Sequence, residues 1–386
     1  MRTAPVAAPQ PHRRVVAAPL GDHLALFHLD TRRLHLLNGS AAAIWQALPG
    51  VDTVGELTVR LGDDFGVDPL AIRRDVEHSL DQLRADGLLC VDDRFAPARP
   101  TAPSTFVPGR EADGARGCFA ALDARVRLCS DDAEIGAVVA AVLAPLASDD
   151  TPTHEISIRA GENGAWLLRV DDGATASMAS PLSIVLRAVA EINNLAVASV
   201  PDHLVFHAGA VARDGAAVLL PAASNHGKST LTTALVRAGM DYLTDEAAAV
   251  GPDEMVRPYA KAIALDPGSF PLFSDLAPAP DKVGLARAIA CREWHIAPDR
   301  LGSVGESSRI TAIVCPHWRA GASTRVTEIA ADEALHLLLG ETFDFAPGGQ
   351  AVFERLVRLV DDVPVYRLGY GELAEAVVAV ERILAE

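Results

Sequence analysis

Residues 219–235, LLPAASNHGKSTLTTAL, combine a glycine, a lysine and two hydroxyl residues at positions where they could bind phosphate. An apolar segment precedes Gly227-Lys228-Ser229, and a helical pattern follows it. A strand, a loop and a helix in this order direct the helix's free N–H groups and positive dipole end at an anion. In such loops the lysine reaches the β- and γ-phosphates and the serine hydroxyl binds Mg²⁺. The segment therefore predicts a site for ATP and Mg²⁺.

The residues expected to contact the nucleotide form one continuous run, namely Ala223, Ser224, Asn225, His226, Gly227, Lys228, Ser229 and Thr230. Ala222 occupies the position where such loops have their first glycine. If that position required a positive φ, its Cβ would cost about 1–2 kcal/mol. Charge-assisted phosphate contacts are worth roughly 1.5–3 kcal/mol each. We therefore expect a weakened loop that still binds. The chain has only three lysines among its 34 basic residues, which makes a chance lysine here less expected.

Two adjacent carboxylates, Asp245 and Glu246, follow the short apolar segment 242–244. At the edge of a sheet they would lie beside the phosphates. One carboxylate would bind the metal and the other would take a proton from an attacking hydroxyl. We expect Asp245 to be the base. Asp245, Glu246 and Ser229 are the candidate ligands of the metal. The alternative is a solvated acidic turn.

Three further kinds of side chain are candidates for the same site. His207, in the segment FHAGAV just before the loop strand, is expected either to point into the site or to be a core histidine. Lys261 is expected to reach a phosphate or to be an exposed loop lysine. Arg309 and Arg319 flank the strand-like segment ITAIVCP and are candidate charge clamps.

FHAGAV, the Gly-Lys-Ser-Thr loop and the Asp-Glu pair resemble the HPr kinase family, whose core is shared with ATP-dependent phosphoenolpyruvate carboxykinase. This resemblance implies an ATP-binding P-loop core, paired acids serving as base and magnesium ligand, and phosphorylation of a serine hydroxyl. It assigns His207, Lys228, Ser229, Asp245 and Glu246 to the site. The chain departs from the family at Ala222 and Glu246, and it lacks the Glu-x-Arg-Gly-x-Gly stretch linked to HPr recognition.

The elements that would position these residues follow an α/β pattern from Phe106 onward. The expected strands are 125–129, 155–159, 165–170, 204–207, 217–220 and 242–244. The expected helices are 132–147, 181–199, 228–238 and a C-terminal one. The fold class predicted is α/β, with a P-loop core of the HPr kinase type and an N-terminal winged-helix-like domain.

The N-terminal part predicts a small separate domain. Residues 23–37 indicate two strands around a turn, followed by three helices that start near Ser40, after Thr53 and after Asp68, and by a strand at 88–91. LDTRRLHLLNGSAAAIWQAL, TVGELTVRL and VEHSLDQLRADGLL resemble PqqD-like peptide-recognition domains. That resemblance implies a precursor leader peptide, bound as an added strand in the groove between the strands and the third helix. The alternative, a DNA-binding winged helix, is disfavoured because helix 69–86 is net acidic.

The domains expected are a disordered tail over 1–14, a PqqD-like domain over 15–95, a linker over 96–105 and a kinase-like domain over 106–386. The last is divided into an auxiliary part, 106–200, and a P-loop core, 201–386. The net charge of −17 argues against nucleic acid or an anionic membrane as partner. No run of 18 apolar residues is found, and five scattered cysteines fit a cytoplasmic location.

Together the two domains predict an ATP-dependent kinase that phosphorylates a Ser or Thr hydroxyl of a ribosomally synthesised precursor peptide. Two alternatives are left open: an inactive leader-peptide-binding scaffold, and a phosphotransferase acting on a small molecule. The sequence leaves a homo-oligomer open.

Overall fold

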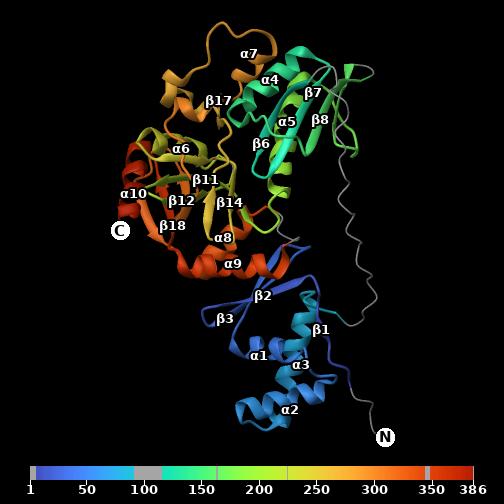
Figure 1. Cartoon of the computed structure of the whole chain (residues 1–386). Coiled ribbons are helices and arrows are strands. Elements are labelled where there is room, and N and C mark those ends of the chain that lie inside the picture. The colour runs from blue at the N-terminus through green and yellow to red at the C-terminus, as the bar shows by residue number, and fades with distance from the viewer. Residues whose placement is uncertain (1–5, 91–114, 162–163, 224, 344–347, 386) are drawn as a thin grey trace. The chain divides into compact units, whose positions relative to one another are not determined.

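The computed structural model describes residues 6–90, 115–161, 164–223, 225–343 and 348–385. The chain forms two compact units. The N-terminal unit contains residues 1–103 together with 348–362, and the second unit contains 104–347 and 363–386 (Figure 1).

The N-terminal unit has the two paired strands and three helices that the sequence predicts, together with a third strand of the same sheet, β2 (Val15–Leu20), that it does not predict. An antiparallel sheet of β2 (Val15–Leu20), β3 (His23–His28) and β4 (Arg33–Leu37) is followed by α1 (Gly39–Ala47), α2 (Val54–Phe65) and α3 (Pro69–Ala85). The capping box at the start of α2 is confirmed: Thr53 Oγ1 accepts from the N–H of Glu56, and the Glu56 carboxylate accepts from the N–H of Asp52.

Both faces of this sheet are covered, because every residue of β3 after His23 is buried. Leu24 and Leu26 pack with the cores of α1, α2 and α3. Phe27, on the opposite face, stacks on Phe353 of α9 (Gly349–Asp362), with ring centroids 5.8 Å apart. Because successive side chains of a strand point to opposite faces of the sheet, one face packs against α1, α2 and α3 and the other against α9.

Two expected boundaries differ from the structure. Residues 6–14 are not a disordered tail, since β1 (Gln10–Pro11) pairs with β5 (Leu89–Cys90). Helix α9 falls in the range expected for the kinase-like domain, but its contacts group it with the N-terminal unit. Its apolar residues are spaced so that they lie on one face of the helix, and this face becomes buried by packing against the sheet. The expected linker, 96–105, lies outside the described residues.

The second unit begins with a five-stranded sheet in the order β10-β9-β8-β7-β6. Its strands are β6 (Ala115–Ala121), β7 (Ala124–Ser130), β8 (His154–Ala160), β9 (Trp166–Val170) and β10 (Ala176–Met178), and α4 (Ala133–Leu143) and α5 (Pro181–Ala198) pack against it. By length and composition α5 is the one described helix that could cross a membrane. Its apolar residues Ile184, Ala188 and Ile192 are fully buried in the core of this unit, as in a core helix.

The second sheet of this unit has eight strands. Its strands are β11 (Leu204–Arg213), β12 (Ala216–Pro221), β13 (Asp241–Thr244), β14 (Ala247–Val250), β15 (Met255–Arg257), β18 (Ser308–Trp318), β19 (Arg325–Glu328) and β20 (Val365–Tyr370). Strand β18 runs parallel to both β12 and β20, so the carboxyl ends of these three strands point the same way. Ligands of α/β proteins bind at that edge.

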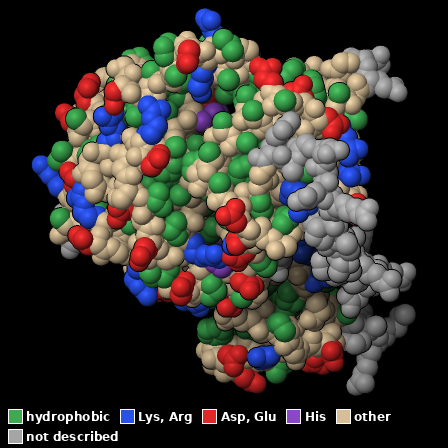
Figure 2. All heavy atoms as spheres, turned by 45° about the horizontal axis from the view of Figure 1, so that its top comes forward, with side chains coloured by type: hydrophobic (Ala, Val, Ile, Leu, Met, Phe, Trp, Pro, Cys, Tyr) green, Lys and Arg blue, Asp and Glu red, His purple; other side chains and the backbone are tan. Residues whose placement is uncertain are grey.

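Helix α6 (Lys228–Arg237) follows β12, and α10 (Leu373–Ala385) follows β20. The other elements include the pair β16 (Ile263–Leu265) and β17 (Trp294–Ile296), the 3₁₀ segment Pro267–Leu276, and the helices α7 (Gly284–Ala290) and α8 (Ala331–Glu341). On the face drawn in Figure 2, Lys and Arg side chains are interspersed with Asp and Glu.

Candidate functional site

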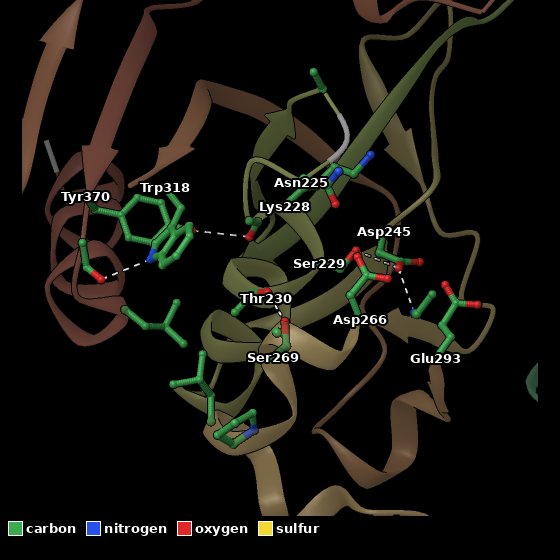
Figure 3. Close-up of a pocket in the computed structure, with 18 of the residues that line it drawn as sticks. Asn225, Lys228, Ser229, Thr230, Asp245, Asp266, Ser269, Glu293, Trp318 and Tyr370 are labelled. Carbon is green, nitrogen blue, oxygen red and sulfur yellow. Dashed lines mark hydrogen bonds between the residues drawn. The ribbon is translucent and has the colours of Figure 1, made fainter. Parts of the chain in front are cut away.

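A cavity of about 620 Å³ opens where β12, β18 and β20 end, and all its lining residues belong to the second unit. The loop between β12 and α6, called the Lys228 loop here (described residues 222–223 and 225–227), crosses its middle. Figure 3 shows Trp318 and Tyr370 on one side of this loop and Asp245, Asp266 and Glu293 on the other. The cavity therefore has an aromatic end and an acidic end.

The Lys228 loop has the conformation that its glycine and asparagine allow. Gly227, the N-cap of α6, has φ 90°, and Asn225 has φ 67°. A Cβ on Gly227 would lie 2.4 Å from Tyr370 Oη, so glycine is required here by both strain and space. Ala222 is not among the described non-glycine residues with positive φ, so the strain considered for this alanine does not arise.

Lys228 begins α6, and its ammonium group faces His207 on β11. The distance from Lys228 Nζ to His207 Nε2 is 2.9 Å. Burial lowers the pKa of Lys228, and this effect is partly opposed by Asp245, Glu246 and Glu341. The lysine is therefore a largely desolvated cation held at the start of a helix, a place where an anion is favoured.

Asp245 is almost fully buried, and both of its carboxylate oxygens have donors. Tyr242 donates to Oδ1 at 3.0 Å and the N–H of Ala264 to Oδ2 at 3.1 Å. Ser229 Oγ lies 3.5 Å from the same Oδ2. Burial, followed by the charge of Asp245, raises the pKa of Tyr242 well above its ordinary value, so its hydroxyl remains a donor.

Lys261 is buried between the two acids. Its Nζ lies 3.7 Å from Asp245 Oδ1 and 3.2 Å from Glu246 Oε2. Burial by itself would lower the pKa of Lys261, but the two carboxylates outweigh it and raise that pKa. The expectation of an exposed loop lysine is wrong, because the two acids stabilise a charge that burial alone would exclude.

Glu246 is the more accessible acid of the pair. Its side chain is 28% exposed and lines the cavity, whereas that of Asp245 is 2% exposed. Glu246 Oε1 is 3.8 Å from His207 Nε2. In the described part of the chain, no group of three or more His, Cys, Asp or Glu side chains could hold a metal ion. The oxygens of Ser229 and Asp245 are nevertheless the ligand types that Mg²⁺ takes when phosphates complete its shell.

Most of the residues expected at the site do converge on the cavity. Its lining includes Ala223, Asn225, Gly227, Lys228, Ser229, Thr230, His207, Asp245 and Glu246. His226 does not line it, and its ring packs against His317. Ser224 lies outside the described residues. Arg309, at the amino end of β18, pairs with Glu254, and neither it nor Arg319 lines the cavity, so the structure does not support them as clamps.

Several lining residues were missed because they are distant in sequence and belong to no motif. Trp318 and Tyr370 come from the ends of β18 and β20, and Glu293 comes just before β17. Burial raises the pKa of Glu293, whose carboxylate is 3.2 Å from His295 Nε2. Ser269 Oγ bonds with Thr230 Oγ1 at 2.6 Å. The available signal for such residues was their position directly after or before a strand. It could not be used, because the sequence alone does not give the order of strands in the sheet.

The N-terminal unit offers a second candidate site, an exposed strand edge. Among the described strands, β4 pairs only with β3, so its outer edge is open. The edge of β2 is different, because the Gln350 amide bonds both the N–H and the carbonyl of Ala17. His35 of β4 lies 3.7 Å from Asp86 at the end of α3, which places the open edge beside that helix.

A match to a protein-family model supports the N-terminal assignment. Residues 24–89 match the family model described as coenzyme PQQ synthesis protein D (PqqD). No curated protein matches the chain. A solved structure described as TbiB1 in complex with the TbiA(beta) leader peptide is similar at 25% identity and a TM-score of 0.20, covering 23% of this chain and 99% of that one. The region from β3 to β5 is thus a PqqD-type domain within a larger mixed α/β chain.

Proposed function

We propose that this chain is an ATP-dependent phosphotransferase that acts on a Ser or Thr hydroxyl of a ribosomally synthesised precursor peptide held by its leader. The observation that carries the proposal is the convergence of Lys228, the start of α6 and the Asp245–Glu246 pair on one cavity. Its volume of about 620 Å³ lies within the range of roughly 300–1,000 Å³ common for ligand pockets.

The Lys228 loop would hold the phosphates through its backbone N–H groups and the start of α6. Lys228 would then exchange its contact with His207 for phosphate oxygens. Ser229 and Asp245 are the residues that would hold Mg²⁺, since their oxygens already lie 3.5 Å apart. When bound, the ion would neutralise charge on the β- and γ-phosphates.

Glu246 is the residue that we assign as proton acceptor. The sequence alone favoured Asp245, but both Asp245 oxygens already accept hydrogen bonds and its side chain is far less exposed than that of Glu246. In the proposed step the substrate oxygen bonds to the γ-phosphorus, the bond from that phosphorus to the β–γ bridging oxygen breaks, ADP leaves, and the hydroxyl proton passes to Glu246.

The PqqD-type domain would bind the leader along the open edge of β4. An extended peptide can add there as a further strand, with backbone hydrogen bonds supplying affinity and neighbouring side chains supplying selectivity. Holding the leader raises the effective concentration of the remaining peptide at the cavity. The match over residues 24–89 supports this part of the proposal.

The test uses the full chain, Mg²⁺-ATP and precursor peptides encoded by short reading frames beside the gene. We expect one peptide to gain the mass of a phosphoryl group, and Lys228→Ala to abolish this gain while leaving leader affinity unchanged. Arg309→Ala, an exposed cation outside the cavity, is the matched control and should keep activity. Leader binding without nucleotide binding would instead support a scaffold. Peptide-independent phosphorylation of a small molecule would support the other alternative.

A further inference from the structure

The aromatic end of the cavity is formed by a tryptophan that is unusually open for so large an apolar side chain. Trp318, the last residue of β18, is 48% exposed and lines the cavity. Its indole is nevertheless fixed, because Nε1 donates to the carbonyl of Gly371 at 3.2 Å. A tryptophan whose polar atom is satisfied by the protein offers its flat apolar surface to whatever enters.

This ring stands directly beside the Lys228 loop. The N–H of Trp318 donates to the carbonyl of His226 at 3.2 Å, and a Cβ on Gly227 would lie 3.2 Å from Trp318 Cβ. Figure 3 shows Trp318 on the side of the loop opposite Asp245 and Glu293. A ligand whose phosphates lie on the loop therefore has carboxylates at one end and an indole at the other.

The two ends suit different parts of a phosphoryl-transfer reaction. The acidic end contains Asp245, Glu246, Asp266 and Glu293, and beside it lies the serine proposed to hold the metal. A hydroxyl that must lose a proton belongs at this end. The nucleoside must then leave the loop at the other end, where Trp318 and Tyr370 supply aromatic surface (Figure 3).

We propose that Trp318 is the stacking platform for the purine of the bound nucleoside triphosphate. This inference rests on the proposed function and adds the direction of the nucleotide: base on Trp318, phosphates on the Lys228 loop, γ-phosphate toward Glu246. Stacking requires only the π face of a base, which an anchored indole provides.

The experiment compares Mg²⁺-ATP with Mg²⁺-tripolyphosphate, which has the phosphates but no base, by calorimetric titration of the full chain. We expect Trp318→Ala to weaken ATP binding at least about fivefold, the low end of measured base-stacking effects. Tripolyphosphate affinity should not change. Trp318→Phe should retain most of the ATP affinity, and Leu186→Ala, which truncates an exposed side chain outside the cavity, should match the parent chain.

The remaining outcomes separate this inference from the proposed function. Unchanged ATP affinity in Trp318→Ala would overturn the stacking role alone. An equal loss for ATP and tripolyphosphate would also overturn it, since the ring would then only support the loop. If the parent chain binds neither compound, both proposals fail. Quenching of tryptophan fluorescence by ATP, lost in Trp318→Phe, would support stacking independently.

Discussion

At the residue scale, Asp245 and Glu246 both lie beside the buried ammonium group of Lys261. The two carboxylates lie within 3.7 Å of this one buried ammonium group. The attraction between the carboxylates and the ammonium group offsets the cost of removing these charges from water. The sequence placed Lys261 in a loop framed by proline and glycine, which is typical of surface positions. In the structure Lys261 is buried, shortly before β16, which pairs with the later strand β17.

Replacing Lys261 with methionine should therefore destabilise the second unit strongly. The change keeps much of the side-chain volume but removes the ammonium group that pairs with both acids, and breaking such a buried pair costs about 3–5 kcal/mol. Chemical denaturation followed by circular dichroism measures the free energy of unfolding. Lys282→Met, at an exposed lysine, is the matched control and should change stability little. Equal small effects of both substitutions would contradict the structural role given to Lys261.

At the element scale, the loop and helix that carry Lys228 are positioned by close packing of β11 against α6. Gly209 of β11 faces Thr232 of α6, and a Cβ on this glycine would lie 2.3 Å from Thr232 Oγ1. The glycine in FHAGAV is thus explained by the approach of a helix. The strands and helices named from hydrophobic periodicity are confirmed here, because each has a regular apolar pattern and several have clear caps.

Gly209→Ala should push α6 away from the sheet and cost about 1–3 kcal/mol, the range for overpacking a filled interior. Adding Thr232→Ala removes the clashing hydroxyl and should recover part of that loss. Thermal unfolding of the parent chain, the two single variants and the double variant gives the four stabilities of a double-mutant cycle. Gly340→Ala, in α8 where nothing lies within 4 Å of the new Cβ, is the control and should be neutral or slightly stabilising. Strict additivity of Gly209→Ala and Thr232→Ala would disprove the contact.

At the scale of the whole molecule, the N-terminal unit is discontinuous in sequence. Helix α9 comes after more than 200 residues of the second unit, yet it covers the sheet face that includes Phe27. Its Gln350 also occupies backbone groups of β2. The result is that β4 presents the open sheet edge on which the leader peptide is proposed to add.

Phe353→Ala should consequently unfold the N-terminal unit at lower denaturant concentration. Phe353 is fully buried, and removing such a ring typically costs about 3–5 kcal/mol. Hydrogen exchange measured by mass spectrometry in the full chain should show the loss of protection in β2 and β3. Phe65→Ala, at a 61% exposed phenylalanine of the same unit, supplies the matched control. Unchanged protection in β2 and β3 would mean that α9 does not stabilise this sheet.

The sequence by itself determined the features that depend on neighbours along the chain. These are the elements around the Lys228 loop, the capped helices of the PqqD-type domain, and the types and spacing of the candidate residues Lys228, Ser229, Asp245 and Glu246. Local periodicity, caps and loop chemistry act over a few residues, so one sequence suffices to read them.

Only the tertiary structure decided which distant residues meet. Parallel pairing of β18 with β12 and β20 brings Trp318 and Tyr370 to the loop, and pairing of β16 with β17 brings Glu293 to the cavity. The same is true of α9 and its sheet. Such contacts depend on strand order and on which apolar faces are left to be buried. Neither is fixed by local propensity, because a given amphipathic element can pack equally well against several partners until the whole chain is arranged.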